Sequence, residues 1–217
     1  QMLQGKHMLT HTYRLMIGES VMYARLSIIW ATDNKHMIIG VMNIDQEVQR
    51  EKEVQKQLHV ANEKAYRDEL TGVKNKASYK ELEAVLNTRI RENTAGEFSV
   101  VVCDVNGLKL INDRQGHIEG DAYIRSASML ICHIWKHSPV FRIGGDEFAV
   151  VLQAEDYQQR HTLLESLKNQ VLENRRNGRV VVAAGMADYE PDRDTSVASV
   201  FERADGQMYE NKTALKA

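Results

Sequence analysis

Residues Val140–Leu152 read VFRIGGDEFAVVL, and this stretch decides the fold of the region around it. Two apolar, β-prone runs are joined by two glycines and two acids, a pattern that predicts a tight β-hairpin with carboxylates at its tip. The amides of Gly144 and Gly145 have no side chain in front of them, so they can lie against a phosphate. Asp146 and Glu147 can hold the metal ion that a phosphate carries. A plain solvated turn is the alternative that the hairpin alone leaves open.

A second carboxylate follows a predicted buried strand. Residues 98–104 read FSVVVCD, an apolar run that ends at Asp104. Mg²⁺ in phosphoryl-transfer sites is held by one or two carboxylates together with the phosphates of the substrate. A strand-end acid beside the acids of the hairpin therefore predicts a magnesium site at Asp104, Asp146 and Glu147.

Four blocks of sequence follow one another in about the last two thirds of the chain. They are DELTGVKNK at 68–76, DVNGLKLINDRQGHIEGD at 104–121, RIGGDEF at 142–148 and ADGQMYENK at 204–212. Together they resemble the GGDEF domain of diguanylate cyclases. The resemblance implies condensation of two GTP molecules into cyclic di-GMP, with release of two pyrophosphates. It also implies a homodimer in which each subunit holds one GTP, with Mg²⁺ or Mn²⁺ as the cofactor.

The resemblance assigns roles to residues within these blocks. The catalytic residues are Asp104, Asp146 and Glu147, and the metal ligands are these carboxylates with the backbone carbonyl of Val105. Asp146 and Glu147 are both candidates for the base that takes the proton of the attacking hydroxyl. The substrate-binding positions are Leu108, Lys109, Asn112, Asp121, Gly144, Gly145, Lys212 and Lys216.

Two kinds of side chain at these positions contact different parts of the substrate. The three lysines match positions that bind the triphosphate as point charges, although alone they would be taken for surface residues. Asn112 and Asp121 match the residues that read guanine, because a carboxylate accepts from the N1 and N2 donors that adenine lacks. Asp121 therefore argues against a cyclase that makes adenine-containing dinucleotides. Without the resemblance, Asp121 is predicted to cap a helix that begins near Ala122.

The segment just ahead of the hairpin departs from the family pattern. Many GGDEF domains carry an inhibitory product site, built on an Arg-x-x-Asp motif, at this place. Trp135 and Ser138 occupy its two positions here, so we expect product feedback to be absent or weak. Arg142 is predicted to pair with a carboxylate at the hairpin tip and to position the loop.

The order of elements after residue 67 predicts an α+β fold. Helices are predicted at 77–93, 120–135, 156–173 and 196–216, strands at 98–104 and 179–187, and the hairpin at 140–152. This order favours a central, mostly antiparallel sheet covered by helices, as in ferredoxin-like and polymerase-palm folds. The resemblance implies that residues 67–217 form the GGDEF domain.

Two further parts precede that domain. Residues 1–45 predict a hairpin with strands at 23–30 and 36–44, similar to the last strands of a PAS sensor domain, with an unassigned β appendage as the alternative. Residues 46–66 predict a linker helix. Its apolar seam, Val54, Leu58, Ala61 and Ala65, fits either a short coiled coil between two chains or an exposed helix.

Composition and charge limit the classes of partner that the chain is expected to bind. The 217-residue chain has a formal net charge of −2, and its Lys and Arg residues are spread along the sequence. This excludes a basic field for nucleic acid and a polybasic membrane patch. Arg25, Asp33 and Lys35 interrupt the most apolar region, so no membrane span is predicted. The opening residues, Gln1-Met2, suggest a fragment whose parent could carry membrane helices upstream.

The two cysteines of the chain bear on its redox environment. Cys103 and Cys132 lie in apolar runs without metal-ligand spacing, which predicts free thiols in a reducing cytosol.

The alternative function is a catalytically silent GGDEF domain that binds GTP or docks a partner. Silent members usually lack acids at the hairpin, and this chain keeps both.

Overall fold

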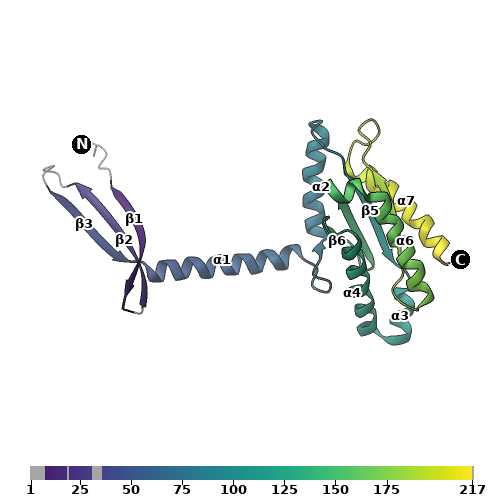
Figure 1. The fold of residues 1–217 in the computed structure, drawn as a ribbon, viewed down its shortest axis with the longest axis horizontal. Coiled ribbons are helices and arrows are strands. Elements are labelled where there is room, and N and C mark those ends of the chain that lie inside the picture. The colour runs from purple at the N-terminus through teal and green to yellow at the C-terminus, as the bar shows by residue number, and fades with distance from the viewer. Residues whose placement is uncertain (1–7, 19, 31–35, 217) are drawn as a thin grey trace. The chain divides into compact units, whose positions relative to one another are not determined.

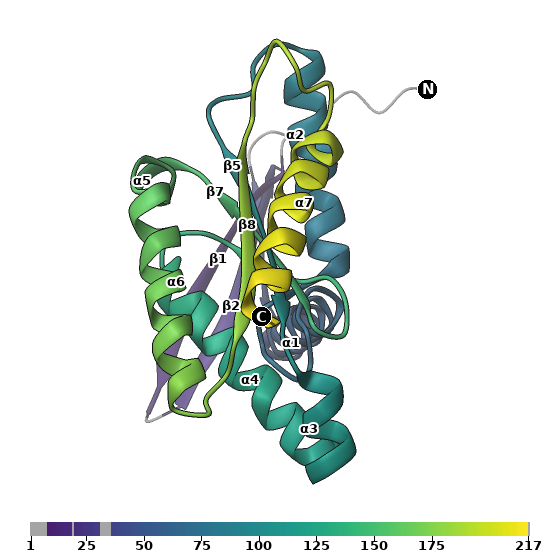
Figure 2. The same cartoon turned by 90° about the vertical axis from the view of Figure 1, so that its right-hand side faces the viewer.

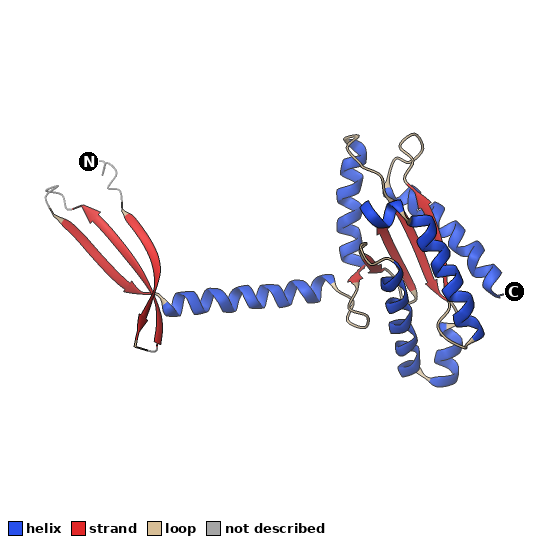
Figure 3. Cartoon of the chain, in the orientation of Figure 1, coloured by secondary structure: helices blue, strands red, loops and turns tan. Residues whose placement is uncertain are grey.

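The structure is a computed structural model that describes residues 8–18, 20–30 and 36–216 (Figure 1). The chain divides into two compact units, residues 1–62 and 63–217. Figure 3 shows strands and one helix in the first unit and a mixture of helices and strands in the second. No helix of the described residues is long and apolar enough to cross a membrane.

The first unit contains a three-stranded antiparallel sheet in the order β1-β2-β3. The strands are β1 (Leu9–Ile17), β2 (Ser20–Trp30) and β3 (Met37–Asn43). The pairing of β2 with β3 confirms the predicted hairpin, whose turn at residues 31–35 lies outside the described residues. Strand β3 is exposed at every residue. The likeness to a PAS domain stays a prediction.

Helix α1 (Asp45–Tyr66) follows this sheet directly. Asp45 ties the two together, because its Oδ1 accepts a hydrogen bond from the Tyr23 amide at 2.6 Å and its own amide donates to Asn43 Oδ1 at 2.8 Å. Along the predicted seam, Val54 and Leu58 are 56% and 60% exposed. Both interpretations of the seam, coiled coil and exposed helix, fit this exposure.

The second unit is built on a five-stranded sheet in the order β4-β6-β7-β5-β8. Its strands are β4 (Lys74–Asn75), β5 (Ser99–Val105), β6 (Val140–Arg142), β7 (Glu147–Leu152) and β8 (Val182–Asp188). Only the short pair β4 and β6 is parallel, and the other three pairs are antiparallel. The predicted α+β fold with a mostly antiparallel central sheet is confirmed.

Helices cover both faces of this sheet (Figure 2). On one face lie α2 (Lys76–Arg91) and α7 (Val197–Lys216), and on the other α4 (His117–Ile134) and α6 (Arg160–Arg176). Because side chains alternate along a strand, Val100 and Val102 of β5 pack with α2 and α7, whereas Val101 and Cys103 pack with α4 and α6. Each buried valine contributes about 1.5–3 kcal/mol. Burial on both faces explains the continuous apolar run of β5.

Some predicted boundaries are wrong. A helix that the sequence did not indicate, α3 (Leu108–Gln115), precedes α4, and the two are separated by Gly116 at φ 85°. Since α4 begins at His117, Asp121 lies inside it and is not its N-cap. The predicted helix at 156–173 is two helices, α5 (Ala154–Gln158) and α6, interrupted at Gln159. Of the two free thiols, Cys103 is buried and Cys132 half-buried.

Helix α7 packs tightly on the edge strand β8 at Gly185. A Cβ placed on this glycine would lie 2.2 Å from both the carbonyl oxygen of Ala204 and the amide nitrogen of Met208. The obstructing atoms are backbone atoms of a helix and cannot rotate away. The position therefore fixes how closely α7 approaches the sheet.

We expect Gly185→Ala to lower the free energy of unfolding by about 1–3 kcal/mol, since overpacking forces the helix to shift. The matched control is Gly206→Ala, which lies in α7 itself and has open space around the new Cβ. This control is expected to gain about 1 kcal/mol from helix propensity. Urea unfolding of the two variants measures the difference. Equal stability would contradict the tight packing.

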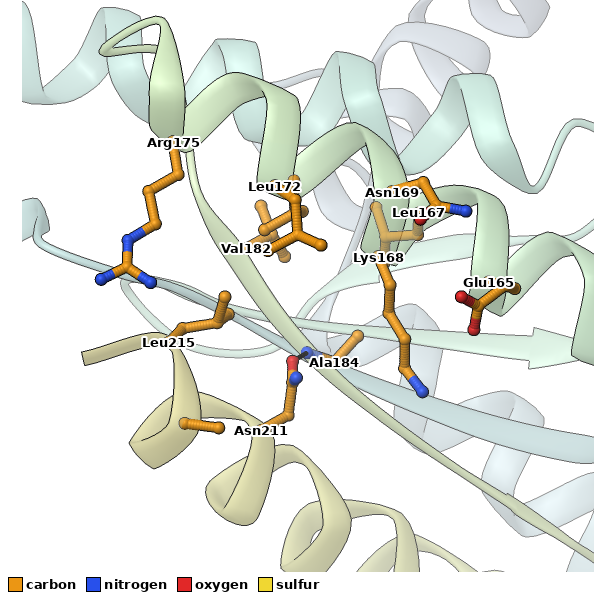
Figure 4. Close-up of a pocket in the computed structure, with 12 residues that line it drawn as sticks. Glu165, Leu167, Lys168, Asn169, Leu172, Arg175, Val182, Ala184, Asn211 and Leu215 are labelled. Carbon is orange, nitrogen blue, oxygen red and sulfur yellow. Dashed lines mark hydrogen bonds between the residues drawn. The ribbon is translucent and has the colours of Figure 1, made fainter. Parts of the chain in front are cut away.

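Asn211 of α7 closes part of the outer edge of β8. Its Oδ1 accepts a hydrogen bond from the Ala184 amide at 3.0 Å, as Figure 4 shows at the wall of a cavity between α6 and α7. At the opposite edge, β4 is only two residues long. One edge of the five-stranded sheet is thus very short, and at the other edge the Ala184 amide is already paired.

Candidate active site

The predicted metal-binding residues meet where β5 ends and β7 begins. Asp104 and Glu147 are paired across the two strands. The amide of Val105 donates to the carbonyl oxygen of Asp146 at 2.9 Å. Asp104 is 5% exposed, whereas Asp146 is half-buried and Glu147 exposed. The backbone thus brings together all four residues that were predicted to bind metal.

Lys212 of α7 faces the buried carboxylate from the neighbouring helix. Its Nζ lies 2.6 Å from Asp104 Oδ1, and the lysine side chain is 26% exposed. This contact pairs the ammonium group of Lys212 with the buried carboxylate of Asp104. The predicted triphosphate-binding lysine therefore lies directly at the predicted metal ligand.

Asn106, which sequence reasoning missed, adds a buried side-chain oxygen two residues after Asp104. This residue is 8% exposed, and within the described residues its Oδ1 has no hydrogen-bond donor. Tyr123 holds the adjacent backbone, since its hydroxyl contacts the Asn106 carbonyl at 3.3 Å. Buried oxygens without donors are uncommon, and Mg²⁺ is bound by such oxygens. The unpaired Asn106 oxygen therefore fits a hard divalent cation.

The three carboxylates themselves do not converge as predicted. No group of three or more His, Cys, Asp or Glu among the described residues is placed to hold a metal ion. The Glu147 side chain folds over Gly144, where its Oε2 lies 2.4 Å from the place a Cβ of that glycine would take. Glu147 also lines a cavity of about 330 Å³ together with Tyr79 and Phe201. The strands align the residues, and the Glu147 side chain lies against Gly144 within the hairpin.

Arg142 ties the hairpin tip to a distant turn. Its Nε and Nη2 donate to the Gly145 carbonyl at 3.2 and 2.7 Å, and its Nη1 donates to both carboxylate oxygens of Asp68 at 3.0 and 3.1 Å. The prediction that Arg142 pairs with an acid of the tip is therefore wrong, because its partner is Asp68. The expected positioning role is supported by the bonds to Gly145.

The amide of Gly144 is already used inside the hairpin. It donates to the Glu147 carbonyl at 3.3 Å, as does the amide of Ile143 at 3.0 Å. A phosphate would have to compete with this turn, so the predicted free amide of Gly144 is corrected. The role predicted for Gly145 stays a prediction.

Asp68 is held in its charged form by the same turn. Partial burial acts to raise the pKa of Asp68, but hydrogen bonds from Thr71 and Arg142 outweigh it and hold the pKa below its ordinary value. The Thr71 amide and hydroxyl donate to Asp68 Oδ1 at 2.9 and 2.6 Å. The link from Thr71 through Asp68 and Arg142 to Gly145 is thus a continuous set of hydrogen bonds.

We expect Asp68→Asn to reduce stability at neutral pH and to matter less in acid. A carboxylate with a depressed folded-state pKa adds stability above its unfolded pKa of about 3.9 and loses that contribution as pH falls through the folded value. Urea unfolding should show the largest difference from wild type near neutrality and a smaller one below about pH 4. The exposed Asp113→Asn serves as control. A difference that does not change with pH would contradict the ion pair.

The residues predicted to read guanine lie where α3 meets α4. The Asn112 amide packs against Gly120, where a Cβ would lie 1.8 Å from Asn112 Oδ1. Asp121 is the next residue and is exposed. On the first turn of α3, Leu108 is half-buried and Lys109 exposed. The side chain predicted to bind phosphate at position 216 lies outside the described residues.

The comparisons with known proteins agree with this fold. The family model for "Diguanylate cyclase, GGDEF domain" matches residues 65–217. Diguanylate cyclase DgcP of Pseudomonas aeruginosa is 31% identical over 159 residues, which are 70% of this chain and 23% of DgcP. An uncharacterized membrane protein of Staphylococcus haemolyticus is 31% identical over 157 residues, which are 68% of this chain and 43% of that protein. This chain therefore spans less than half the length of either relative.

A solved structure of a GGDEF domain has a fold similar to that of this chain. The crystal structure of the coiled coil and GGDEF domain of DgcB from Caulobacter crescentus, in complex with c-di-GMP, has a TM-score of 0.67 at 25% sequence identity. The match covers 79% of this chain and 93% of that one. With the family model covering more than half of its residues, the chain belongs to the GGDEF family of diguanylate cyclases.

Proposed function

We propose that this chain condenses two GTP molecules into cyclic di-GMP and releases two pyrophosphates. The observation that carries the proposal is the meeting of Asp104 with Glu147, and of Val105 with Asp146, at the adjoining ends of two strands. The buried Asn106 oxygen, which has no hydrogen-bond donor among the described residues, supports a cation there. The relatives named diguanylate cyclases support the reaction type.

In this proposal, Mg²⁺ or Mn²⁺ is held by Asp104, the Val105 carbonyl, Asp146 and Glu147. When bound, such an ion neutralises charge on phosphate oxygens and acidifies an attacking hydroxyl. Asp146 and Glu147 remain the two candidates for the base.

The remaining residues of the proposed site bind and orient the nucleotide. Lys212 and Lys109 hold the triphosphate, while Asn112 and Asp121 select guanine through its N1 and N2 donors. The product has two phosphodiester bonds, so each 3′-hydroxyl must attack the α-phosphorus of the other nucleotide. Placing the reactants in line supplies much of the rate enhancement.

We infer that two copies of the chain act together, each with one GTP. The exposed Val54 and Leu58 of α1 support association of two linker helices. The inferred location is the cytoplasm, which agrees with the free thiols of Cys103 and Cys132. A parent protein anchored upstream is compatible with this location.

Incubation with GTP and Mg²⁺ over a range of protein concentrations tests the activity. Cyclic di-GMP, separated by chromatography, should form at a rate per chain that rises with protein concentration, since the active species is a dimer. Excess ATP should neither replace GTP nor enter the product. Absence of product at high concentration would overturn the proposal.

The second candidate is a silent GGDEF domain that binds GTP, and the contact of the Glu147 side chain with Gly144 inside the hairpin favours it. Equilibrium dialysis with GTP separates the two candidates. Saturable binding without turnover in either Mg²⁺ or Mn²⁺ would establish the silent domain, whereas turnover that Asp104→Ala abolishes would exclude it.

We expect Gly120→Ala to raise the KM for GTP about tenfold with little change in stability. The new methyl group would displace the Asn112 amide, which is the end of a flexible side chain and can move without unfolding the helix. Losing one hydrogen bond to the base corresponds to about 1–2 kcal/mol, which agrees with this factor. Glu119→Ala, on the same turn, should leave the KM unchanged. A normal KM for Gly120→Ala would remove Asn112 from the guanine site.

A further inference from the structure

Helices α6 and α7 enclose a cavity of about 280 Å³ over the outer edge of β8 (Figure 4). Cavities for drug-sized ligands measure about 300–1,000 Å³, so this one suits a small molecule. Most of its wall is apolar, and Figure 4 shows Leu172 of α6, Val182 of β8 and Leu215 of α7 around it. Leu172 is 46% exposed although it is a large aliphatic residue. The cavity therefore offers apolar surface that a bound apolar group would remove from water.

Two cationic side chains of α6 border the cavity. Lys168 and Arg175 are seven residues apart, so they lie on the same face of the helix, and Figure 4 shows both extending toward α7. Both are exposed, and neither side chain has a hydrogen-bond or ion-pair partner among the residues that the structure describes. One acid, Glu165, also lines the cavity, at the end away from Arg175. The Arg175 end therefore favours an anion.

Asn211 of α7 adds a hydrogen-bond donor to this end of the cavity. Its Oδ1 accepts from the Ala184 amide at 3.0 Å, and this bond fixes the orientation of the side-chain amide. The Nδ2 group carries two N–H donors, for which the described residues provide no acceptor. Figure 4 shows the Asn211 side chain pointing into the cavity between Arg175 and Lys168. A carboxylate matches these donors, because its two oxygens can accept from a guanidinium and from an amide.

We propose that this cavity binds a small monocarboxylate with an apolar body. Its carboxylate accepts from Arg175 and from the Asn211 amide, and its body lies on Leu172, Val182 and Leu215. An ion without an apolar part would leave these aliphatic side chains in water, whereas an uncharged molecule would leave the arginine unpaired. None of the residues that line the cavity belongs to the predicted GTP or metal site, so the two sites are separate.

Occupancy of the cavity reaches the proposed active site through α7. The residue after Asn211 is Lys212, whose Nζ lies 2.6 Å from Asp104 Oδ1. The hydrogen bond between Ala184 and Asn211 holds this part of the helix to the sheet. A carboxylate that binds Asn211 therefore also restrains Lys212. An effect on turnover rests on the proposed cyclase activity, whereas binding itself does not.

Isothermal titration calorimetry of the whole chain with 3-phenylpropionate, in the absence of GTP and metal, tests the binding. Saturable binding at one site is expected. The uncharged analogue 3-phenylpropanamide should bind about tenfold or more weakly, because it forms no charge-assisted hydrogen bond. Acetate should also bind more weakly, since it lacks the apolar body. In NMR spectra, the side-chain amide signals of Asn211 should shift along the same saturation curve.

Arg175→Gln should weaken binding of 3-phenylpropionate about tenfold or more. The matched control is Arg176→Gln, which removes the same charge from the next residue of α6, an exposed arginine that does not line the cavity. Its affinity should stay within about twofold of wild type. Ala214 lines the cavity and is exposed, so Ala214→Phe should fill the space without unfolding α7 and should abolish binding. Circular dichroism checks that every variant is folded.

Four results would overturn the proposal: no saturable binding, equal affinities for the carboxylate and its amide, equal weakening by Arg175→Gln and Arg176→Gln, or unchanged binding to Ala214→Phe. The last result would mean that the anion associates only with the surface. None of these measurements uses GTP. A chain without cyclase activity can therefore still bind the carboxylate, and an active cyclase can fail to bind it, so the two proposals are tested separately.

Discussion

Asp104→Asn is expected to lower the rate of cyclic di-GMP formation about a thousandfold while leaving the chain folded. Asparagine keeps the shape of the side chain but removes the negative charge that is paired with Lys212 at 2.6 Å. Without this charge, the proposed site loses its most buried acidic metal ligand. The variant should therefore fail in turnover rather than in folding.

Initial rates at saturating GTP and Mg²⁺ measure this effect, with Asp113→Asn as the control because that acid is exposed on α3. The control should keep wild-type turnover. A Mg²⁺ titration provides a second readout. Because Asp104→Asn removes a proposed metal ligand, it should raise the Mg²⁺ concentration needed for the half-maximal rate. Turnover of Asp104→Asn within a few fold of wild type would remove Asp104 from the proposed metal site.

Arg142→Met should lower turnover about a hundredfold and the free energy of unfolding by about 2–4 kcal/mol. The arginine side chain is 14% exposed and its partner Asp68 21% exposed, so the pair is only weakly screened by water. Methionine preserves the length of the side chain but removes the bonds to Asp68 and to the Gly145 carbonyl. The tip then loses its attachment to the turn that contains Thr71.

A double-mutant cycle separates these two contacts. Combining Arg142→Met with Asp68→Asn should give a coupling free energy of about 1–3 kcal/mol in unfolding experiments. Asp68→Asn alone should reduce turnover less, because Arg142 still donates to Gly145. Arg142→Lys keeps the charge but not the fork, so intermediate turnover is expected. Additive stability effects would show that the pair does not act as one unit.

The hairpin and the central strand were predictable because their signals are local. Two apolar runs around Gly144 and Gly145 specify β6 and β7, and the run from Phe98 to Asp104 has enough β-branched residues to specify β5. Helix α3 was missed because its eight residues lie between two glycines and bury no side chain. Its ends depend on Gly107 and Gly116 at φ 80° and 85°, which a residue pattern does not reveal.

The side-chain arrangement at the site was less predictable than the strands. Arg142 has two acids within five residues, yet it binds Asp68, which lies 74 residues earlier. Only the parallel pairing of β4 with β6 brings that turn beside the hairpin. Likewise, sequence alone gives no reason for Glu147 to fold over Gly144, or for the Asn106 oxygen to be buried without a donor. These depend on packing among elements that are distant in sequence.

The two borders of the five-stranded sheet affect how copies of this domain meet. A border strand recruits a foreign strand through a row of unpaired amides and carbonyls. Here one border is two residues long, and at the other an asparagine from α7 already occupies the Ala184 amide. Open-ended growth of the sheet from molecule to molecule is therefore discouraged.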